Sequence, residues 1–302
     1  MKMFQTIKRI VRDQWFRAYR IAGRLLIKYS NDPRPSSAPY ISGDGFRKLG
    51  DHIHDETGNC DPNQVKEHDI VFVGAARSKE FLTEMNPQIQ VPYTLVSHNS
   101  DELIDESYLP LLTSNIQRWY SYNVGVKDER IVPLPLGLGN KHYYATGITR
   151  VFDIVIKKQY PKQNKIFYWY SLSTNICARQ EALEAIQTHP LAQPLAHQVE
   201  FGPYLHESAQ YKFIQSPRGS SIEGHRTWEA MYIGSVPIVL ADVMSEYFQS
   251  LNAPMMVITD WSELDSIQAG NADTTYRDII DSSDQNVLTM DYWAEKIKQA
   301  ER

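Results

Sequence analysis

Residues 216–242, SPRGSSIEGHRTWEAMYIGSVPIVLAD, combine turn residues, two arginines and an apolar run. The pattern predicts a strand that ends in a Gly/Ser-rich loop, followed by a helix that begins near His225. Such a turn presents free backbone N–H groups and the positive end of a helix dipole, which suit a phosphate. Arg218 in the loop and Arg226 in the first helical turn add charge, and arginine can contact two phosphate oxygens at once. The segment therefore predicts a diphosphate site.

A carboxylate follows one turn later in the same predicted helix. Glu229 lies three residues after Arg226, between Trp228 and Ala230 in an otherwise apolar stretch. It could form an ion pair with Arg226 within the helix. Alternatively, it could accept hydrogen bonds from the two hydroxyls of a ribose, as acidic residues do in dinucleotide-binding folds. Both interpretations stay open from the sequence.

The sequence lacks the common motifs for other ways of holding a nucleotide. It contains neither GxxxxGK[ST] nor GxGxxG, which disfavours a kinase, an ATPase or a dehydrogenase. It also lacks an Asp-x-Asp pair, the usual holder of a metal–diphosphate complex. We therefore expect no cofactor and no essential metal, with Arg, His and backbone donors neutralising the diphosphate.

Segment 216–242 resembles the donor-binding segment of exostosin-type glycosyltransferases. There, a Pro/Gly loop is followed by an Arg, a Glu-Ala pair on a helix, a Gly and a Val/Ile-Pro-Val/Ile strand. The segment is more distantly similar to the alpha-1,3-fucosyltransferase group, and FYWYSLSTNICAR (167–179) is similar to the first strand and loop of the same domain. The resemblance implies a GT-B fold of two Rossmann-like domains. It also implies a nucleotide-sugar donor on the C-terminal domain, and a saccharide or lipid-linked acceptor held mainly by the N-terminal one.

The resemblance assigns roles to individual donor-binding residues. It implies that Arg226 faces the diphosphate and Glu229 the ribose. His225 lies beside Arg226, so we expect it to contact the donor and not to act as the base; the alternative is a solvent-facing helix residue. The phosphate loop and the opposite wall of the cleft would be formed by two groups: Arg218, Gly219, Ser220 and Ser221, and Ser173, Thr174, Asn175 and Arg179. The chain has no clear counterpart of the N-terminal segments of animal exostosins, so the acceptor and the sugar do not carry over. The expected activity is sugar transfer in polysaccharide or glycoconjugate synthesis.

An inverting transferase needs a base near the acceptor hydroxyl, and in this architecture the base usually comes from the N-terminal domain. Three side chains stand where N-terminal strands are expected to end: Asp44 in ISGDGF, and His98 and Asp101 in SHNSDE. Asp44 and Asp101 could equally cap the helices that follow. Two alternatives stay open. A retaining reaction would need no such base, and the chain could instead be a non-catalytic subunit that binds a nucleotide sugar or a glycan.

The elements that must position these residues follow an alternating pattern. Short apolar runs typical of buried parallel strands occur in two series: 69–75, 93–98, 118–123 and 130–138, then 165–172, 198–202, 211–217, 236–242 and 254–260. Helical segments at 178–189 and 225–234 separate some of them, and a terminal helix begins near residue 287. The sequence predicts two α/β domains, residues 40–155 and 156–302, with ligands bound between the carboxyl ends of their sheets.

Residues 1–39 differ in character from the rest. The first 30 residues carry eight Lys and Arg and one acid, whereas the remaining chain carries 23 basic and 35 acidic residues, which disfavours a nucleic-acid role. On a helix, one apolar stripe would contain Phe4, Ile7, Val11, Trp15, Ala18, Ala22 and Leu25. This pattern, followed by a Pro/Ser linker, is typical of a helix lying in an anionic membrane interface. The alternative is a helix that packs its stripe on the protein's own body.

The sequence also bears on the compartment. Only two cysteines occur, Cys60 and Cys177, with no spacing typical of a metal site, which favours a reducing environment. There is no apolar run of about 18 residues and no signal-peptide pattern. We therefore expect a cytoplasmic protein, peripheral on the cytoplasmic face of a membrane if the basic helix meets lipid.

Overall fold

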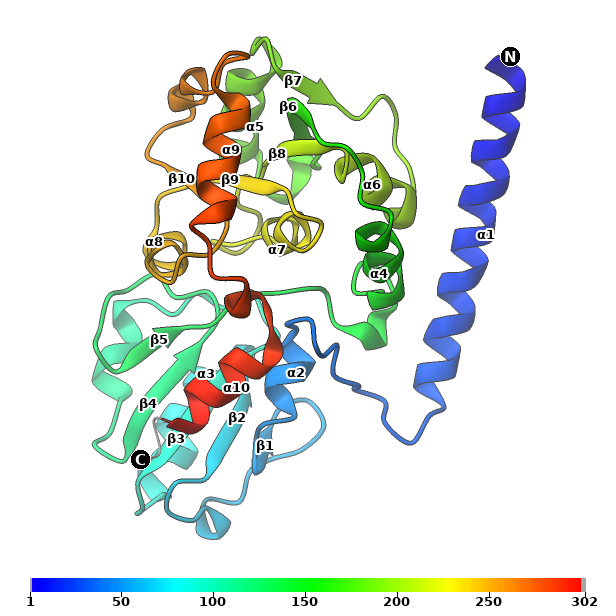
Figure 1. Cartoon of the computed structure of the whole chain (residues 1–302). Coiled ribbons are helices and arrows are strands. Elements are labelled where there is room, and N and C mark those ends of the chain that lie inside the picture. The colour runs from blue at the N-terminus through cyan, green and yellow to red at the C-terminus, as the bar shows by residue number, and fades with distance from the viewer. Residues whose placement is uncertain (1, 300–302) are drawn as a thin grey trace.

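The computed structural model describes residues 2–299, without the side chains of residues 2–10, 12 and 13. The chain forms two α/β domains (Figure 1). The strands are β1 (His52–His54), β2 (Ile70–Gly74), β3 (Tyr93–His98), β4 (Ile116–Ser121), β5 (Ile131–Pro133), β6 (Gln163–Tyr168), β7 (Ala192–Pro194), β8 (Tyr211–Gln215), β9 (Val236–Leu240) and β10 (Met256–Ile258). The helices are α1 (Lys2–Lys28), α2 (Gly43–Arg47), α3 (Ser78–Glu80), α4 (Thr149–Lys157), α5 (Ile176–Gln187), α6 (Phe201–Ser208), α7 (His225–Tyr232), α8 (Val243–Ser250), α9 (Ala272–Asp281) and α10 (Met290–Gln299).

Each domain is built on a sheet of five parallel strands, which confirms the expected fold class. The N-terminal sheet has the order β1-β2-β3-β4-β5, and the C-terminal sheet has the order β10-β9-β8-β6-β7. Every residue of β3 and β8 is buried, as expected for parallel strands that are covered on both faces. The short edge strand β1 was not predicted because its sequence, HIH, lacks an apolar run.

The C-terminal sheet contains a topological switch point. Counted from the first strand of the domain, its order is 2-1-3-4-5, so the direction of winding reverses between β6 and β8. Open α/β sheets bind ligands outside the carboxyl ends of the strands at such a point. The loops that follow β6 and β8, residues 169–175 and 216–224, are therefore the expected walls of a ligand site.

One predicted strand of the C-terminal half is corrected. Residues 198–202 were expected to form a strand, but α6 begins within them at Phe201. Phe201, Tyr204 and Leu205 fall at helical spacing and pack into an apolar cluster with α4, which a strand would not allow. The strand beside β6 is instead β7.

The domain boundaries also differ from those expected from the sequence. Helix α4 packs against α6 and so lies with the C-terminal domain, although residues 149–155 were assigned to the N-terminal one. Helix α10 crosses back and packs against α2 (Figure 1). Met290 N–H donates to the Pro39 carbonyl (2.9 Å), and Trp293 and Ile297 are fully buried. The end of the described chain therefore completes the N-terminal domain.

Helix α1 packs on the C-terminal domain, but not through the predicted stripe. The Phe16 side chain is buried, and a Cβ on Gly202 would come within 2.7 Å of its ring. A Cβ on Gly23 would come within 2.1 Å of the Tyr144 ring, so this crossing requires glycine. The stripe residues Val11, Trp15 and Leu25 are instead 62%, 65% and 49% exposed.

Two further observations concern α1 and the membrane. The side chains of two predicted stripe residues, Phe4 and Ile7, lie outside the described part of the chain. Within residues 2–299, no helix combines the length and the apolar character that crossing a bilayer requires.

Candidate functional site

Two adjoining pockets form one cleft between the domains. The first, of about 410 Å³, is lined from the N-terminal side by residues that include His98, Asn99 and Asp101. The second, of about 380 Å³, lies on the C-terminal domain over the ends of β6 and β8. Thr146 and His225 line both pockets, so we treat them as one interdomain cleft. Each volume is in the range of small-molecule sites.

The loop after β8 joins the two domains at this cleft. Four hydrogen bonds tie it to the N-terminal domain. The Ser221 hydroxyl donates to Asp101 (2.6 Å), and the Ile222 N–H donates to the side chain of Asn123 (2.8 Å). The Leu136 N–H donates to the Glu223 carboxylate (2.7 Å), and the Tyr122 hydroxyl donates to the Glu223 carbonyl (3.4 Å). Burial raises the pKa of Glu223 to about 8. The loop is therefore held at the domain interface, and so is the start of α7, which follows it directly.

Two arginines converge on one aromatic ring in the C-terminal pocket. The guanidinium carbons of Arg179 and Arg226 lie 5.9 and 5.5 Å from the centre of the Tyr170 ring. Burial and the charge of Arg226 lower the pKa of Arg179. The Nε of Arg226 is buried without a hydrogen-bond partner, and within residues 2–299 no carboxylate forms an ion pair with either arginine. Positive charge is thus concentrated at the switch point, with no carboxylate of residues 2–299 at ion-pair distance.

Arg179 also fixes the loops that form the pocket. Its guanidinium donates to the carbonyls of Arg218 (3.0 Å) and Ser171 (2.6 Å), one in the loop after β8 and one in the loop after β6. Asn175 reinforces the link, because its side chain donates to the Gly219 carbonyl (2.9 Å). The two loops at the switch point are therefore held together by side chains of the first turn of α5 and its cap.

Glu229 faces the same pocket from α7. Its carboxylate is only 6% exposed, and burial raises its pKa to about 7 even though Arg226 favours the charged form. The ion pair with Arg226 that the sequence allowed does not form in the described chain, and no hydrogen bond from another described side chain or backbone group reaches the carboxylate. The Nε of Arg226 therefore lacks the partner that burial normally requires, and the Glu229 carboxylate faces the pocket without a hydrogen bond from the described chain.

The other predicted donor residues are distributed around this pocket. Arg179, His225, Arg226 and Glu229 line it. The loops behind the pocket contain Asn175, Gly219 and Ser221. Asn175 also caps α5, because its side chain accepts from the Ala178 N–H (3.2 Å). Arg218 is exposed and lines a narrower neighbouring pocket, and Ser173 and Ser220 are exposed and lie outside the pocket lining.

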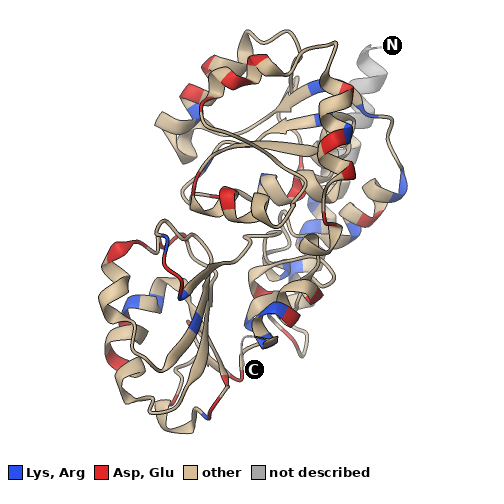
Figure 2. Ribbon diagram, turned by 60° about the vertical axis from the view of Figure 1, so that its left-hand side comes forward, with Lys and Arg blue, Asp and Glu red and all other residues tan. Residues whose placement is uncertain are grey.

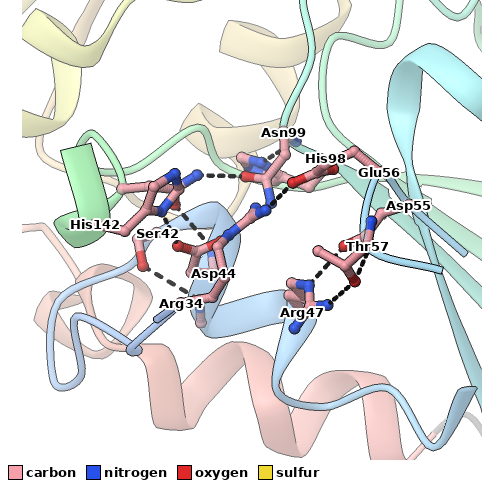
Figure 3. Close-up of polar contacts among 12 residues, drawn as sticks. Arg34, Ser42, Asp44, Arg47, Asp55, Glu56, Thr57, His98, Asn99 and His142 are labelled. Atoms are coloured by element: carbon pink, nitrogen blue, oxygen red, sulfur yellow. Dashed lines mark hydrogen bonds and ion pairs between the residues drawn. The ribbon is translucent and has the colours of Figure 1, made fainter. Parts of the chain in front are cut away.

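Asp44 lies behind the wall of the N-terminal pocket, in a polar network (Figure 3). Its fully buried carboxylate accepts hydrogen bonds from Arg34 (2.8 Å) and His142 (2.6 Å). Burial opposes ionisation of Asp44, but the hydrogen bonds from His142 and Arg34 outweigh it and lower the pKa. The helix cap expected of Asp44 is supplied by Ser42, whose hydroxyl accepts from the Gly45 N–H. Asp44 thus anchors Arg34 and His142 and does not itself line the pocket.

His98 lines the pocket with both ring nitrogens occupied. Nδ1 accepts from the Asn99 N–H (2.7 Å) and Nε2 donates to the Pro135 carbonyl (3.1 Å). The ring is stacked between Phe46 and Tyr122, with centroid distances of 5.4 and 5.0 Å, and burial lowers its pKa to about 4. In this arrangement neither nitrogen can take a proton from a substrate.

Asp101 is the third predicted base and remains open to the cleft. Its side chain is exposed, lines the N-terminal pocket and accepts one hydrogen bond from Ser221.

Across residues 2–299, no three His, Cys, Asp or Glu side chains are grouped as metal ligands would be.

Comparison with known proteins gives likenesses of shape only. No family model matches the chain, and no curated protein matches it. A trehalose 6-phosphate synthase from Burkholderia multivorans is similar at 8% identity and a TM-score of 0.46, over 78% of this chain and 70% of that one. The GtfA/B complex (12%, TM-score 0.44, 79% of this chain and 58% of that one) and the glycotransferase of kitacinnamycin (11%, TM-score 0.29, 77% and 71%) are also similar. With TM-scores below 0.5, none of these carries an argument about what this chain binds.

Proposed function

We propose that this protein is a glycosyltransferase that uses a nucleotide-diphosphate sugar as its donor. One observation carries the proposal: at the switch point of the C-terminal sheet, Arg179 and Arg226 converge without an ion pair, and the nearby Glu229 carboxylate receives no hydrogen bond from the described chain. Unpaired charges are costly to bury, so their partners are expected to come from a ligand. The ligand must then offer an anion and a hydrogen-bond donor a short distance apart.

A nucleoside diphosphate has both groups in this order. Its diphosphate would be neutralised by the two arginines, whose remaining N–H groups would donate to phosphate oxygens. Its ribose hydroxyls would donate to Glu229, as they do to acidic residues in dinucleotide-binding folds. The arginines would supply the positive charge that a metal supplies in other transferases, so the proposed reaction needs no metal.

The N-terminal pocket is the proposed acceptor side. It adjoins the donor pocket through Thr146 and His225, and its lining is mostly polar, which suits the hydroxyls of a saccharide or a lipid-linked glycan. We propose an inverting reaction, in which a hydroxyl bound there attacks the anomeric carbon from the face opposite the diphosphate, in polysaccharide or glycoconjugate synthesis.

A membrane surface is the proposed location of the reaction. Beyond the three exposed stripe residues, α1 and its end expose Ile21, Leu26 and Tyr29 at 59%, 75% and 78%. Arg17, Arg24 and Lys28 are also exposed on this helix, while acidic residues are spread over both domains (Figure 2). Apolar residues flanked by cations suit the interface of an anionic bilayer. The opposite face of α1 is already occupied by the C-terminal domain.

Donor binding tests the proposal directly. A thermal-shift screen of the purified protein against UDP- and GDP-sugars should reveal one donor that raises the melting temperature, because a ligand that binds only the folded state stabilises it. Glu229→Ala should abolish that shift, whereas Glu184→Ala, an exposed glutamate of α5, should keep it. A Glu229→Ala variant that binds every donor as the parent does would overturn the assignment. Tight binding without turnover would identify a non-catalytic subunit instead.

A further inference from the structure

His225 is the first residue of α7 and stands where the donor and acceptor pockets meet. Its Nδ1 lies 2.8 Å from the carbonyl oxygen of Gly137, at the carboxyl edge of the N-terminal domain. A carbonyl can only accept a hydrogen bond, so Nδ1 must carry the hydrogen. The hydrogen bond therefore fixes both the orientation of the ring and its neutral tautomer.

The same hydrogen bond determines whether Nε2 can donate or accept a hydrogen bond. In the neutral ring Nε2 carries a lone pair, and no partner within residues 2–299 uses it. A lone pair cannot donate to a phosphate oxygen, which would repel it. The lone pair can accept a hydrogen bond from a hydroxyl. The sequence led us to expect that His225 contacts the nucleotide sugar, but this geometry suits a contact with the hydroxyl of the acceptor saccharide.

The surroundings of the ring keep it neutral. Burial lowers the pKa of His225, while the Gly137 carbonyl and the carboxylate of Asp101 act in the opposite direction. The other ionisable groups close to it are His98, which is itself held neutral, and the adjacent Arg226. A neutral imidazole is the form that can accept a proton.

The other side chains that could take a proton from the acceptor hydroxyl are less well placed than His225. Asp44 is enclosed by Arg34 and His142, and both nitrogens of His98 are bound to the backbone. Asp101 is open to the cleft but lines only the acceptor pocket, whereas His225 lines both. The reacting hydroxyl must lie between the two pockets, next to His225.

We propose that Nε2 of His225 accepts the proton of the acceptor hydroxyl, an inference that rests on the proposed function. The hydroxyl oxygen forms a bond to the anomeric carbon as the bond from that carbon to the diphosphate oxygen breaks. The electron pair of the broken bond leaves with the nucleoside diphosphate. The hydroxyl proton moves to Nε2, and the imidazolium later releases it to water.

His225→Asn is the variant that tests this role. An asparagine amide can still donate to the Gly137 carbonyl, but it removes the lone pair at the position of Nε2. The control is His68→Asn: His68 is exposed and has φ of 67°, a conformation that asparagine accepts readily. The probe is the UDP- or GDP-sugar that gives the largest thermal shift, and the measurement is release of UDP or GDP with water as acceptor.

We expect His225→Asn to bind the donor as the parent does and to lose activity on the order of 100-fold or more. We expect the parent's kcat/KM to fall at acidic pH, where His225 is protonated, and His225→Asn to lack this fall. His68→Asn should match the parent throughout. Asp101→Asn should keep the acidic fall, because His225 still titrates in it.

Three results would overturn the inference. His225→Asn could keep the parent's rate, it could lose donor affinity together with rate, or the parent's rate could be flat at acidic pH. If His225→Asn does not fold, the pH profiles of the parent and of Asp101→Asn decide alone, because an acidic fall that vanishes in Asp101→Asn would assign the base to Asp101. A parent protein that binds no donor at all would contradict the proposed function, and with it this inference.

Discussion

Replacing Glu229 by glutamine should stabilise the protein without ligand. Burial raises the pKa of this carboxyl from 4.5 to about 7. A pKa change of one is worth about 1.4 kcal/mol, so the ionised carboxylate costs the folded protein about 3 kcal/mol relative to the neutral acid. Glutamine has nearly the same shape and carries no charge, so it should remove most of this cost.

The effect of Glu229 on the free energy of unfolding depends on pH. The unfolded chain releases the Glu229 proton near its ordinary pKa of 4.5, whereas the folded protein keeps it until about pH 7. Between these values the folded state binds more protons, so the free energy of unfolding falls as pH rises. The destabilisation should be complete above about pH 7 and absent below about pH 4.5.

Urea denaturation followed by tryptophan fluorescence measures this effect. At about pH 8, Glu229→Gln should be more stable than the parent by about 3 kcal/mol, and at about pH 4.5 the two should be equal. Comparing the two proteins at each pH cancels other titrations, including that of Glu223, whose pKa is raised to about 8. A variant no more stable than the parent at the higher pH would refute the claim that Glu229 is an unpaired buried charge.

Two further predictions concern α1 and the Asp44 network. Trp15→Glu should reduce sedimentation with phosphatidylglycerol liposomes, because it places a negative charge on the exposed apolar face, whereas Ile154→Glu, at a 50% exposed apolar residue of α4, should not. Equal sedimentation of both variants would contradict the lipid-facing surface. Asp44→Asn should lower the free energy of unfolding near neutral pH by about 3 kcal/mol, because it leaves Arg34 and His142 without their carboxylate. The difference from the parent should shrink as pH falls below 3.8, since the lowered pKa of Asp44 contributes stability only while the carboxylate is ionised; a difference that persists in acid would refute the ion-pair explanation.

The features predicted best from the sequence are local in the chain. The strand, loop and helix of residues 211–232 were expected in their observed order, and Arg226 and Glu229 share one helix, so their common pocket follows from helical spacing. The buried strands β2, β3, β8 and β9 were expected because their apolar runs are nearly continuous.

The features missed from the sequence depend on contacts between distant segments. Tyr170, whose ring both arginines approach, has no local signal that separates it from Tyr168 or other core aromatics. The pairing of Asp44 with His142 joins residues 98 positions apart. The packing of α1 through Gly23 contradicts the alternative that the apolar stripe packs on the body, because close approach to Tyr144 depends on a missing side chain and not on hydrophobicity.

The most direct test of the central claim is a crystal structure of the protein with UDP or GDP, whichever stabilises it more. The account predicts that the diphosphate lies between Arg179 and Arg226 and that the ribose hydroxyls donate to Glu229. The nucleotide would then occupy the pocket at the ends of β6 and β8. A nucleoside diphosphate bound elsewhere, or bound in this pocket without contact to Arg226 and Glu229, would contradict it.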